Sequence, residues 1–366
     1  MIDAARIKKA LIVLPNWIGD AVMAVPAISR IRDILPSAHV TILGLQHICE
    51  LFQESPYMDE TLVYSKPLLA TVNDIKKYGY DIAILLPNSF RSALIAHLAR
   101  IPLRCGYNRD GRGFMLNIPV KVDSKVKRLH QAEYYLNLAE NRRDKNVPPI
   151  GDRRGFSSTE LTTGPTPSNG KQKEWLHLSL DEIQRGKEML SKNNIPPDSL
   201  IIGINPGAAY GSAKRWYPER FARLSKILAN KYNAKIIVFG GKQEQDTTEL
   251  IVNISQVSIL NMAGKTSVRE LMAIIKHCRV FITNDSGPMH IAAALGVPVV
   301  AIFGSTDPAR TGPLGDQHIV IKKDVACSPC FLRKCYKDLL CMDLISVDDV
   351  LRGVKRRLEV RKSWGK

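Results

Sequence analysis

The stretch Thr283-Asn284-Asp285-Ser286-Gly287-Pro288-Met289-His290 decides how this chain is interpreted. Residues 280–283 form a short apolar run that is typical of a buried strand, and Pro288 suits the first turn of a helix that Gly296 would end. A strand that leads into a helix N-terminus presents free N–H groups beside an acid, a hydroxyl and an imidazole. This pattern suits a ligand with phosphates and sugar hydroxyls. The alternative is that the aspartate and the serine only cap a buried helix.

Short apolar or β-branched runs alternate with helical patterns on both sides of this stretch, as in a parallel sheet covered on both faces. In the first half, the pattern predicts strands over 10–14, 40–43, 61–64 and 81–86 and helices over 21–35 and 68–78. In the second half, it predicts strands over 200–205, 235–239, 280–283 and 297–303 and helices over 180–192, 218–231, 245–254, 268–277 and 347–360. The predicted fold class is α/β, with two doubly wound domains.

The alternation disappears between residues 146 and 173, where Pro, Gly, Ser, Thr and charged residues predominate. A length of 366 residues also favours two domains. We expect one domain over 1–150, a polar linker over 151–175, a second domain over 176–346 and a basic C-terminal helix over 347–366. Doubly wound domains bind ligands at the carboxyl ends of their strands, so the cleft between the domains is the expected site.

Lys and Arg outnumber Asp and Glu by 52 to 35, which gives a net charge of +17. Such an excess indicates a polyanionic partner: nucleic acid, an anionic membrane face or a phosphorylated glycolipid. The chain has no compact basic motif or series of stacking aromatic residues, so we do not expect nucleic acid. No apolar stretch reaches the roughly 18 residues of a spanning helix, and the run at 10–14 is too short for a signal peptide. The expected location is cytoplasmic, with peripheral contact at a membrane surface.

A Gly- and Ala-rich loop, residues 207–216, follows the predicted strand 200–205. Its small residues would let the backbone approach a diphosphate, and Lys214 and Arg215 could neutralise that group. The spacing matches neither a P-loop nor a dinucleotide fingerprint. Taken alone, the loop could equally be a solvated turn with two surface cations.

Asp20 lies where the first predicted strand leads into the first predicted helix. Aspartate is common there as an N-cap, although Met23 supplies no capping box. A carboxylate at the carboxyl end of a strand could equally act as a general base. The first domain also carries a basic region, with twelve Lys and Arg against five Asp and Glu in residues 91–145. Arg109, Arg112 and Arg128, in predicted loops, are the better candidates for binding an anionic acceptor.

Four cysteines fall in the spacing C-x2-C-x4-C-x5-C, at Cys327, Cys330, Cys335 and Cys341. Four thiolates so close could hold zinc or an iron–sulfur cluster, but the spacing is not that of a common zinc ribbon or ferredoxin. The odd total of seven cysteines also argues against a secreted disulfide scaffold. We therefore expect reduced or adventitiously paired thiols and no metal site.

Four segments together resemble the ADP-heptose:lipopolysaccharide heptosyltransferases, most closely the heptosyltransferase II branch of that family. The matching segments, in the same order, are Pro15-Asn16-Trp17-Ile18-Gly19-Asp20, then Leu86-Pro87-Asn88-Ser89-Phe90-Arg91-Ser92-Ala93-Leu94, then Asn205 to Trp216, and then the opening stretch. The resemblance covers most of the chain. It implies a GT-B fold, in which two Rossmann-like domains face each other across a cleft, with the acceptor on the first and the nucleotide sugar on the second.

The resemblance also implies roles for single residues. Asp20 corresponds to the catalytic base, Lys214 to the lysine near the donor diphosphate, and Asp285 to the acid that holds heptose hydroxyls; Glu244 would lie near the ribose and Thr266 near the adenine. The full expected donor-binding set is Ala208, Ala209, Ser212, Lys214, Arg215, Glu244, Thr266, Asp285, Ser286, Gly287, Met289 and His290. The expected acceptor-binding set is Asn88, Ser89, Arg91, Arg109, Arg112 and Arg128. The loop 209–212 lacks the paired threonines of some family members.

The implied reaction is inverting transfer of heptose from ADP-L-glycero-D-manno-heptose to the first heptose of the lipopolysaccharide inner core, on a Kdo-lipid A precursor. Fixed cations and helix dipoles would stabilise the departing ADP, so no metal or other cofactor is expected. A phosphorylated acceptor and the anionic cytoplasmic face of the inner membrane would match the basic surface. The alternative within the family is heptosyltransferase I or another heptosyltransferase with a different inner-core acceptor. A nucleic-acid-binding protein and a nucleotide-sugar epimerase are the alternatives from other classes.

Overall fold

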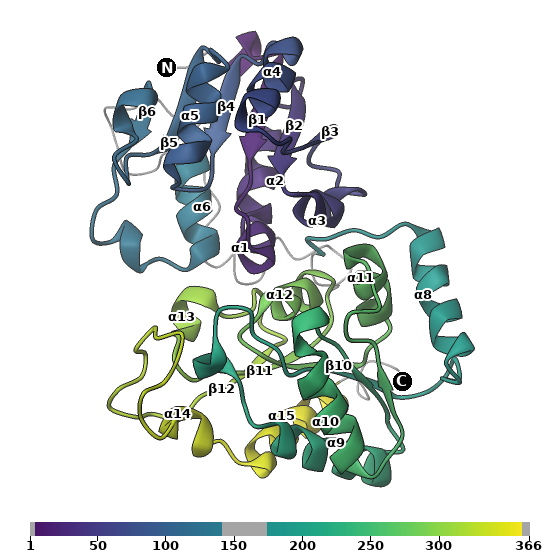
Figure 1. Cartoon of the computed structure of the whole chain (residues 1–366). Coiled ribbons are helices and arrows are strands. Elements are labelled where there is room, and N and C mark those ends of the chain that lie inside the picture. Colours follow the sequence, from purple (N-terminus) through teal and green to yellow (C-terminus); the bar gives the residue numbers. More distant parts are fainter. Residues whose placement is uncertain (1–3, 141–173, 361–366) are drawn as a thin grey trace. The chain divides into compact units, whose positions relative to one another are not determined.

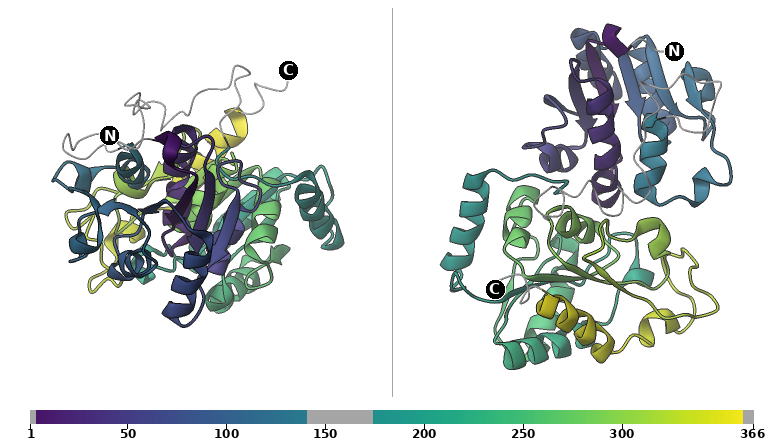
Figure 2. Two further views of the ribbon diagram at one scale, coloured as in Figure 1. Left: turned by 90° about the horizontal axis from the view of Figure 1, so that it is seen from above. Right: turned by 180° about the vertical axis from the view of Figure 1, so that it is seen from behind.

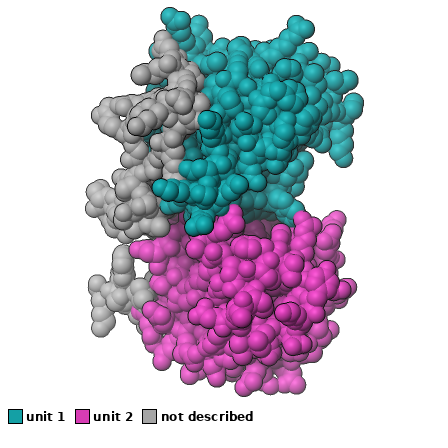
Figure 3. Space-filling view, turned by 90° about the vertical axis from the view of Figure 1, so that its left-hand side faces the viewer, with its two compact units in different colours: residues 1–161, 175–177 teal, residues 162–174, 178–366 magenta. Residues whose placement is uncertain are grey.

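The computed structural model describes residues 4–140 and 174–360. The chain divides into two compact units, which Figure 3 shows in different colours. Unit 1 comprises Met1–Leu161 and Trp175–His177, and unit 2 comprises Thr162–Glu174 and Leu178–Lys366. Most of the predicted linker over 151–175 lies outside the described residues. Each unit is built around a parallel sheet of its own (Figure 1).

The sheet of unit 1 has the strand order β3-β2-β1-β4-β5-β6, and all neighbouring strands are parallel. Its strands are β1 (Lys9–Val13), β2 (His39–Gly44), β3 (Glu60–Val63), β4 (Ile82–Leu85), β5 (Leu103–Tyr107) and β6 (Ile118–Val120). The order reverses between β1 and β4, where Val13 pairs with Leu85. Ligands of Rossmann-type sheets bind at this topological switch point, beyond the carboxyl ends of the strands.

Helices cover both faces of this sheet (Figure 2). They are α1 (Ile18–Met23), α2 (Val25–Ile34), α3 (Gln46–Cys49), α4 (Leu68–Tyr78), α5 (Phe90–Leu98) and α6 (Gln131–Glu140), with short 3-10 turns η1 (Ala4–Arg6), η2 (Glu50–Phe52), η3 (Gly113–Met115) and η4 (Val126–Arg128). The predicted single helix over 21–35 is wrong, because the chain breaks at Ala24 into α1 and α2. Pro26 lies at the start of α2, where its missing N–H is tolerated, but it could not sit inside one continuous helix without loss of a hydrogen bond.

The sheet of unit 2 has the order β12-β11-β10-β7-β8-β9, which repeats the Rossmann order of unit 1. Its strands are β7 (Ile201–Asn205), β8 (Lys235–Val238), β9 (Ile259–Asn261), β10 (Val280–Asn284), β11 (Val299–Ile302) and β12 (Ile319–Ile321). The switch point lies between β7 and β10, where Asn205 pairs with Thr283. The two loops singled out in the sequence, after 205 and after 284, therefore leave neighbouring strands at the same edge.

The helices of unit 2 complete its layers and its core. They are α8 (Leu180–Lys192), α9 (Pro218–Tyr232), α10 (Gln245–Ser255), α11 (Val268–Lys276), α12 (Gly287–Ala294), α13 (Pro308–Thr311), α14 (Leu340–Asp343) and α15 (Val347–Val360), with 3-10 turns η5 (Ser212–Lys214) and η6 (Lys242–Glu244). Val350 and Val354 of α15 are fully buried in one hydrophobic core with strand residues such as Ile202 and Val300. Among the described residues, no helix has the length and apolar character needed to cross a bilayer.

Candidate functional site

The switch point of unit 2 gathers most of the predicted donor-binding residues on the loops that follow four adjacent strands. The loop after β7 carries Lys214, the loop after β8 carries Glu244, the loop after β9 carries Thr266, and the loop after β10 carries Asp285. Because these strands are parallel neighbours, their carboxyl ends lie along one edge of the sheet. The order of strands therefore explains how Lys214 and Asp285, 71 positions apart, come into contact.

Lys214 and Asp285 form an ion pair across this switch point. The Nζ atom of Lys214 lies 2.6 Å from Oδ2 of Asp285, and their side chains are 11% and 4% exposed. The same carboxylate oxygen accepts a hydrogen bond of 2.6 Å from Oγ1 of Thr306 and a longer one of 3.5 Å from Thr311. A buried charge requires a partner of opposite charge and further hydrogen bonds, and both are present. The alternative of a solvated loop with two surface cations is therefore wrong for Lys214.

The segment between β10 and α12 forms the helix terminus that the sequence predicts. Ser286 is the N-cap residue, but its side chain makes no capping bond; instead its Oγ lies 3.0 Å from Oγ1 of Thr283 and accepts from Nδ2 of Asn205 at 3.2 Å. Asp285 precedes the cap and pairs with Lys214, so the alternative that it only caps the helix is wrong.

The first turn of α12 presents backbone rather than side chains to this edge. Gly287 and Met289 have backbone N–H groups without an acceptor inside the helix, and Pro288 has none to offer. The side chains of Met289 and His290 are buried. If these two residues line a diphosphate pocket, as the family resemblance implies, they do so through the helix terminus.

A second polar contact joins the loops after β7 and β8. Arg215 donates through Nη2 to the carbonyl of Ala208 at 3.3 Å and lies 3.5 Å from Oε1 of Glu244. Glu244 also accepts from the N–H of Gly241 at 2.9 Å. A Cβ at Gly207 would lie 2.7 Å from Cγ of Glu244, so this close approach requires glycine.

The other predicted donor-binding residues differ in exposure. Ala208 is buried, Thr266 is half-buried, and Ala209 and Ser212 are exposed. The structure thus places all of these residues on the strand-end loops, with Ala209 and Ser212 most accessible to a ligand.

Residues 328–333, which we call the strap and which were not among the predicted site residues, hold two of these loops. The N–H groups of Cys330 and Phe331 donate to the carbonyl of Ser305 at 3.1 and 2.8 Å, next to Thr306. On the other side, the carbonyl of Arg333 accepts from the N–H of Ala213 at 3.0 Å, next to Lys214. The strap therefore ties the loop of Lys214 to the loop of the threonine that holds Asp285.

Tyr210 and Gly211 lie where the Lys214 loop packs closely against the strap. Oη of Tyr210 donates to the carbonyl of Phe331 at 2.8 Å, and a Cβ at Gly211 would lie only 2.2 Å from the carbonyl oxygen of Arg333. The Tyr210 ring also lies under two cations, Lys214 at 4.8 Å and Arg333 at 5.2 Å from its centroid. Such stacking restrains the lysine that pairs with Asp285.

In unit 1, Asp20 lies at the corresponding switch point, on the helix that follows β1. It is the third residue of α1, whose N-cap position is Trp17, so the N-cap alternative is wrong. Oδ1 of Asp20 lies 3.5 Å from the hydroxyl of Tyr135, a long hydrogen bond. Burial, reinforced by the Asp20 charge, raises the pKa of Tyr135 well above its usual value, so this hydroxyl stays protonated and can donate. Asp20 is half-exposed, as a base that must reach a substrate needs to be.

Three predicted acceptor-binding residues surround the start of α5, which follows β4 across the same switch point. Nδ2 of Asn88 donates to the Tyr134 hydroxyl at 3.0 Å, and Ser89 is the N-cap of α5, with its Oγ accepting from the N–H of Ser92. Arg91 is exposed in the first turn, with its guanidinium 5.7 Å from the Tyr64 ring centroid. Arg109, after β5, and Arg128, in η4, are exposed on other segments of unit 1.

Arg112 does not fit its predicted role as a direct acceptor contact, because it is fully buried. Its guanidinium donates to the carbonyls of Pro87 and Tyr107 and to Oγ of Ser92. Withdrawal from water lowers the pKa of Arg112 to about 10. The expected contact is therefore corrected to a structural role: Arg112 fastens the segment after β4.

The predicted cysteine cluster adjoins the strap. Cys327 is exposed, Cys330 and Cys335 are half-buried, Cys341 is buried, and all are free thiols. Within residues 4–140 and 174–360, no three or more His, Cys, Asp or Glu side chains are grouped so that they could hold a metal ion. The expected absence of a metal stays a prediction.

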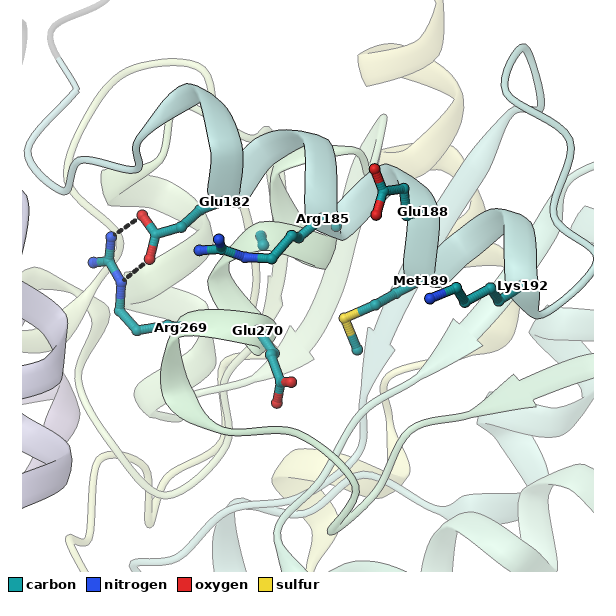
Figure 4. Close-up of a pocket in the computed structure, with 9 residues that line it drawn as sticks. Glu182, Arg185, Glu188, Met189, Lys192, Arg269 and Glu270 are labelled. Atoms are coloured by element: carbon teal, nitrogen blue, oxygen red, sulfur yellow. Dashed lines mark hydrogen bonds and ion pairs between the residues drawn. The ribbon is translucent and has the colours of Figure 1, made fainter.

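A shallow groove of about 230 Å³ lies between α8 and α11, away from the predicted site residues (Figure 4). The two helices meet where Gly186 allows close approach to the backbone of Ala273. At one end of the groove, Arg269 and Glu182 form a two-bond ion pair, with Nε 2.8 Å from Oε1. This pair holds α8 against α11, so we interpret the groove as a packing seam and the strand-end loops as the site.

Comparison with known proteins identifies the family to which these loops belong. Residues 68–340 match the model of glycosyltransferase family 9 (heptosyltransferase). The chain belongs to glycosyltransferase family 9. It is 31% identical to lipooligosaccharide heptosyltransferase 2 of Haemophilus ducreyi, over 86% of this chain and 88% of that protein. It is 30% identical to lipopolysaccharide heptosyltransferase 2 of Salmonella typhimurium, with the same coverage.

A solved structure agrees with this assignment. The E. coli ADP-heptose lipopolysaccharide heptosyltransferase II has a TM-score of 0.79 and 25% identity, covering 97% of this chain and 99% of that one. The family 9 chain is therefore a glycosyltransferase with the GT-B class of fold. The resemblance to the heptosyltransferase II branch is confirmed, and the heptosyltransferase I alternative is not favoured.

Proposed function

We propose that this family 9 enzyme transfers heptose from ADP-L-glycero-D-manno-heptose to a hydroxyl of the first heptose of the lipopolysaccharide inner core, with inversion at the anomeric carbon. The observation that carries the donor half of the proposal is the Lys214–Asp285 pair at the switch point of unit 2, beside the start of α12. A cation, free backbone N–H groups and a carboxylate at one edge match the three parts of the donor: diphosphate negative charge, phosphate oxygens and sugar hydroxyls.

In this mechanism, unit 2 stabilises the leaving group. The bond between the anomeric carbon and the β-phosphate oxygen breaks, and negative charge develops on ADP. Lys214 and the N–H groups of Gly287 and Met289 would face that charge, and because they are fixed before the reaction they need no reorganisation. Asp285, which pairs with Lys214, would in addition accept hydrogen bonds from the heptose hydroxyls. Glu244 and Thr266 would contact the ribose and the adenine.

Asp20 would supply the base. Its carboxylate takes the proton from the acceptor hydroxyl as that oxygen attacks the anomeric carbon from the face opposite to ADP. Tyr135, which donates toward Oδ1 of Asp20, would orient the carboxylate. Asn88, Ser89 and Arg91, on the segment after β4, would contact the acceptor, and the exposed Arg109 and Arg128 would face its phosphates. Because protein groups carry the charge, transfer should persist in a metal chelator.

The acceptor is anchored in a membrane, so we also propose that the enzyme works at the cytoplasmic face of the inner membrane as a peripheral protein. The net charge of +17 supports attraction to anionic lipids. A phosphorylated Kdo-lipid A carrying one heptose would then be both a substrate and part of the attracting surface.

The direct test supplies purified enzyme with ADP-heptose and either of two acceptors, Kdo-lipid A without heptose or with one heptose. Mass spectrometry of the product and release of ADP report transfer. The proposal predicts one added heptose on the acceptor that already carries one. Transfer only to the heptose-free acceptor would instead support a heptosyltransferase I activity, and no transfer to either would contradict the proposal.

A further inference from the structure

Two phenylalanine rings lie exposed side by side on unit 1. Phe90 is the first residue of α5 and is 46% exposed, and Phe114 lies in η3 and is 75% exposed. Their ring centroids are 6.3 Å apart. Neighbouring large apolar side chains on a surface raise the tendency to aggregate, so they are kept where they contact something. We call Phe90 and Phe114 the aromatic pair.

Hydrogen bonds of Arg112 connect the two segments that carry the aromatic pair. Arg112 ends the loop before η3, and its carbonyl accepts from the N–H of Met115 at 3.0 Å. Its buried guanidinium donates to the carbonyl of Pro87, before α5, and at 3.1 Å to Oγ of Ser92, in the first turn of α5. One side chain thus ties the turn that carries Phe114 to the helix that carries Phe90.

Two features of this region, a buried arginine without an ion-pair partner and exposed aromatic side chains, are unfavourable for stability. Arg112 is fully buried, the described residues place no carboxylate within ion-pair distance of it, and its Nη2 has no hydrogen-bond partner among them. Phe114, two residues after Arg112, and Phe90, two residues before its partner Ser92, remain exposed to water. Rules of stability that are broken together at one place indicate a functional surface.

The charge of the chain segment that contains the pair points to its partner. Residues 88–130 contain nine Lys and Arg against two Asp. Seven of the nine are exposed, namely Arg91, Arg100, Arg109, Lys121, Lys125, Lys127 and Arg128. An anionic lipid surface binds proteins that combine exposed aromatic rings with exposed cations: the rings enter the boundary between headgroups and acyl chains, and the cations remain among the phosphates.

We propose that the aromatic pair is the point at which unit 1 inserts into an anionic lipid bilayer. The proposal rests on the proposed function, because a lipid-anchored acceptor requires the enzyme to sit at a membrane. The pair adjoins Ser89 and Arg91, so insertion would bring the predicted acceptor-binding segment to the headgroup level, where the sugar chain of a glycolipid begins.

Sedimentation of the full chain with vesicles tests the proposal. One set of vesicles contains phosphatidylcholine alone, and the other contains equal parts of phosphatidylcholine and phosphatidylglycerol. We expect binding to the anionic set, with each of Phe90→Ser and Phe114→Ser weakening it about tenfold through loss of buried apolar area. The matched control is Leu180→Ser, on α8 of unit 2, where the leucine is 85% exposed; it should bind like the unchanged protein. Thermal unfolding should show that every variant is folded at the temperature of the assay.

Two outcomes would overturn the proposal. One is anionic-vesicle binding by the double variant that equals that of the unchanged protein. The other is vesicle binding that stays unchanged while self-association is lost, which would assign the pair to an interface between copies of the chain. Heptose transfer to a soluble, delipidated acceptor separates this proposal from the proposed function. If no transfer occurs but the vesicle results hold, only the proposed function fails.

Discussion

Replacement of Lys214 by alanine tests the donor site most sharply, because the lysine is held in place before any ligand binds. It lies 2.6 Å from Asp285, and its side chain is 11% exposed. A hydrogen bond to a charged group is worth about 1.5–3 kcal/mol, and about 1.4 kcal/mol changes an affinity tenfold. ADP must share this lysine with Asp285, so we expect the lower part of that range. Lys214→Ala should weaken ADP binding about 10- to 30-fold.

Asp285→Asn should act differently from Lys214→Ala. It removes a negative charge from the neighbourhood of the diphosphate and frees Lys214, so ADP affinity should stay the same or rise. Transfer should nevertheless fall, because the asparagine cannot accept as many hydrogen bonds from the heptose hydroxyls and Lys214 loses its fixed position. Opposite effects on binding and transfer would separate a site residue from a merely structural ion pair.

Isothermal calorimetry of the full chain with ADP provides the measurement. The matched control is Lys226→Ala, since this exposed lysine lies on α9 and its Nζ contacts only Gln256 at 2.6 Å among the described interactions. Removal of Lys214 also leaves the buried Asp285 with only its threonine partners, so the melting temperature must be followed in parallel. Unchanged ADP affinity in a folded Lys214→Ala protein would refute the reasoning, as would an equal loss in Lys226→Ala.

Two further predictions concern the strap and the pH dependence of stability. Gly211→Ala should force the Lys214 loop away from residues 328–333, because its Cβ would lie 2.2 Å from the Arg333 carbonyl oxygen. Hydrogen exchange at the Ala213 amide should accelerate and heptose transfer should fall, and Tyr210→Phe should show smaller changes of the same kind. Unchanged exchange in Gly211→Ala would contradict the role of the strap. Withdrawal from water lowers the pKa of His318 from 6.5 to about 4. Between pH 4 and 6.5 the unfolded chain therefore binds more protons than the folded protein, so the free energy of unfolding should fall as the pH drops through this range. His318→Gln should flatten that part of the pH profile of thermal unfolding. An unchanged profile would show that His318 is not the source of the pH dependence.

The sequence predicted the long elements well because their patterns extend over several turns. The helices predicted over 68–78, 180–192 and 347–360 have these bounds in α4, α8 and α15. The strands β5, β6, β9 and β12 were not predicted, and three of them have only three residues, too few to show a period. β6 also contains Pro119, which is tolerated because β6 lies at the edge of its sheet.

The sequence predicted those site residues that directly follow neighbouring strands of one sheet. Asp285 and Lys214 each follow a strand, and adjacent parallel strands placed them within ion-pair distance. Thr306 and the strap at 328–333 were missed, because ordinary residues on distant loops carry no local signal of their contact. Arg112 was assigned wrongly for a related reason: a charge in a basic region is usually solvated, and only the fold shows that this one is turned inward.

The most direct test of the central claim is transfer by Asp20→Asn, with Asp20→Glu as the matched variant that keeps a carboxylate. Asp20 lies in the first turn of α1 without being its cap, so the loss of its charge there should lower the free energy of unfolding by only about 0.3–1 kcal/mol. Loss of a positioned base should lower turnover about 10²- to 10⁴-fold, with ADP affinity unchanged and partial activity in Asp20→Glu. Near-normal heptose transfer by a folded Asp20→Asn enzyme would contradict the account.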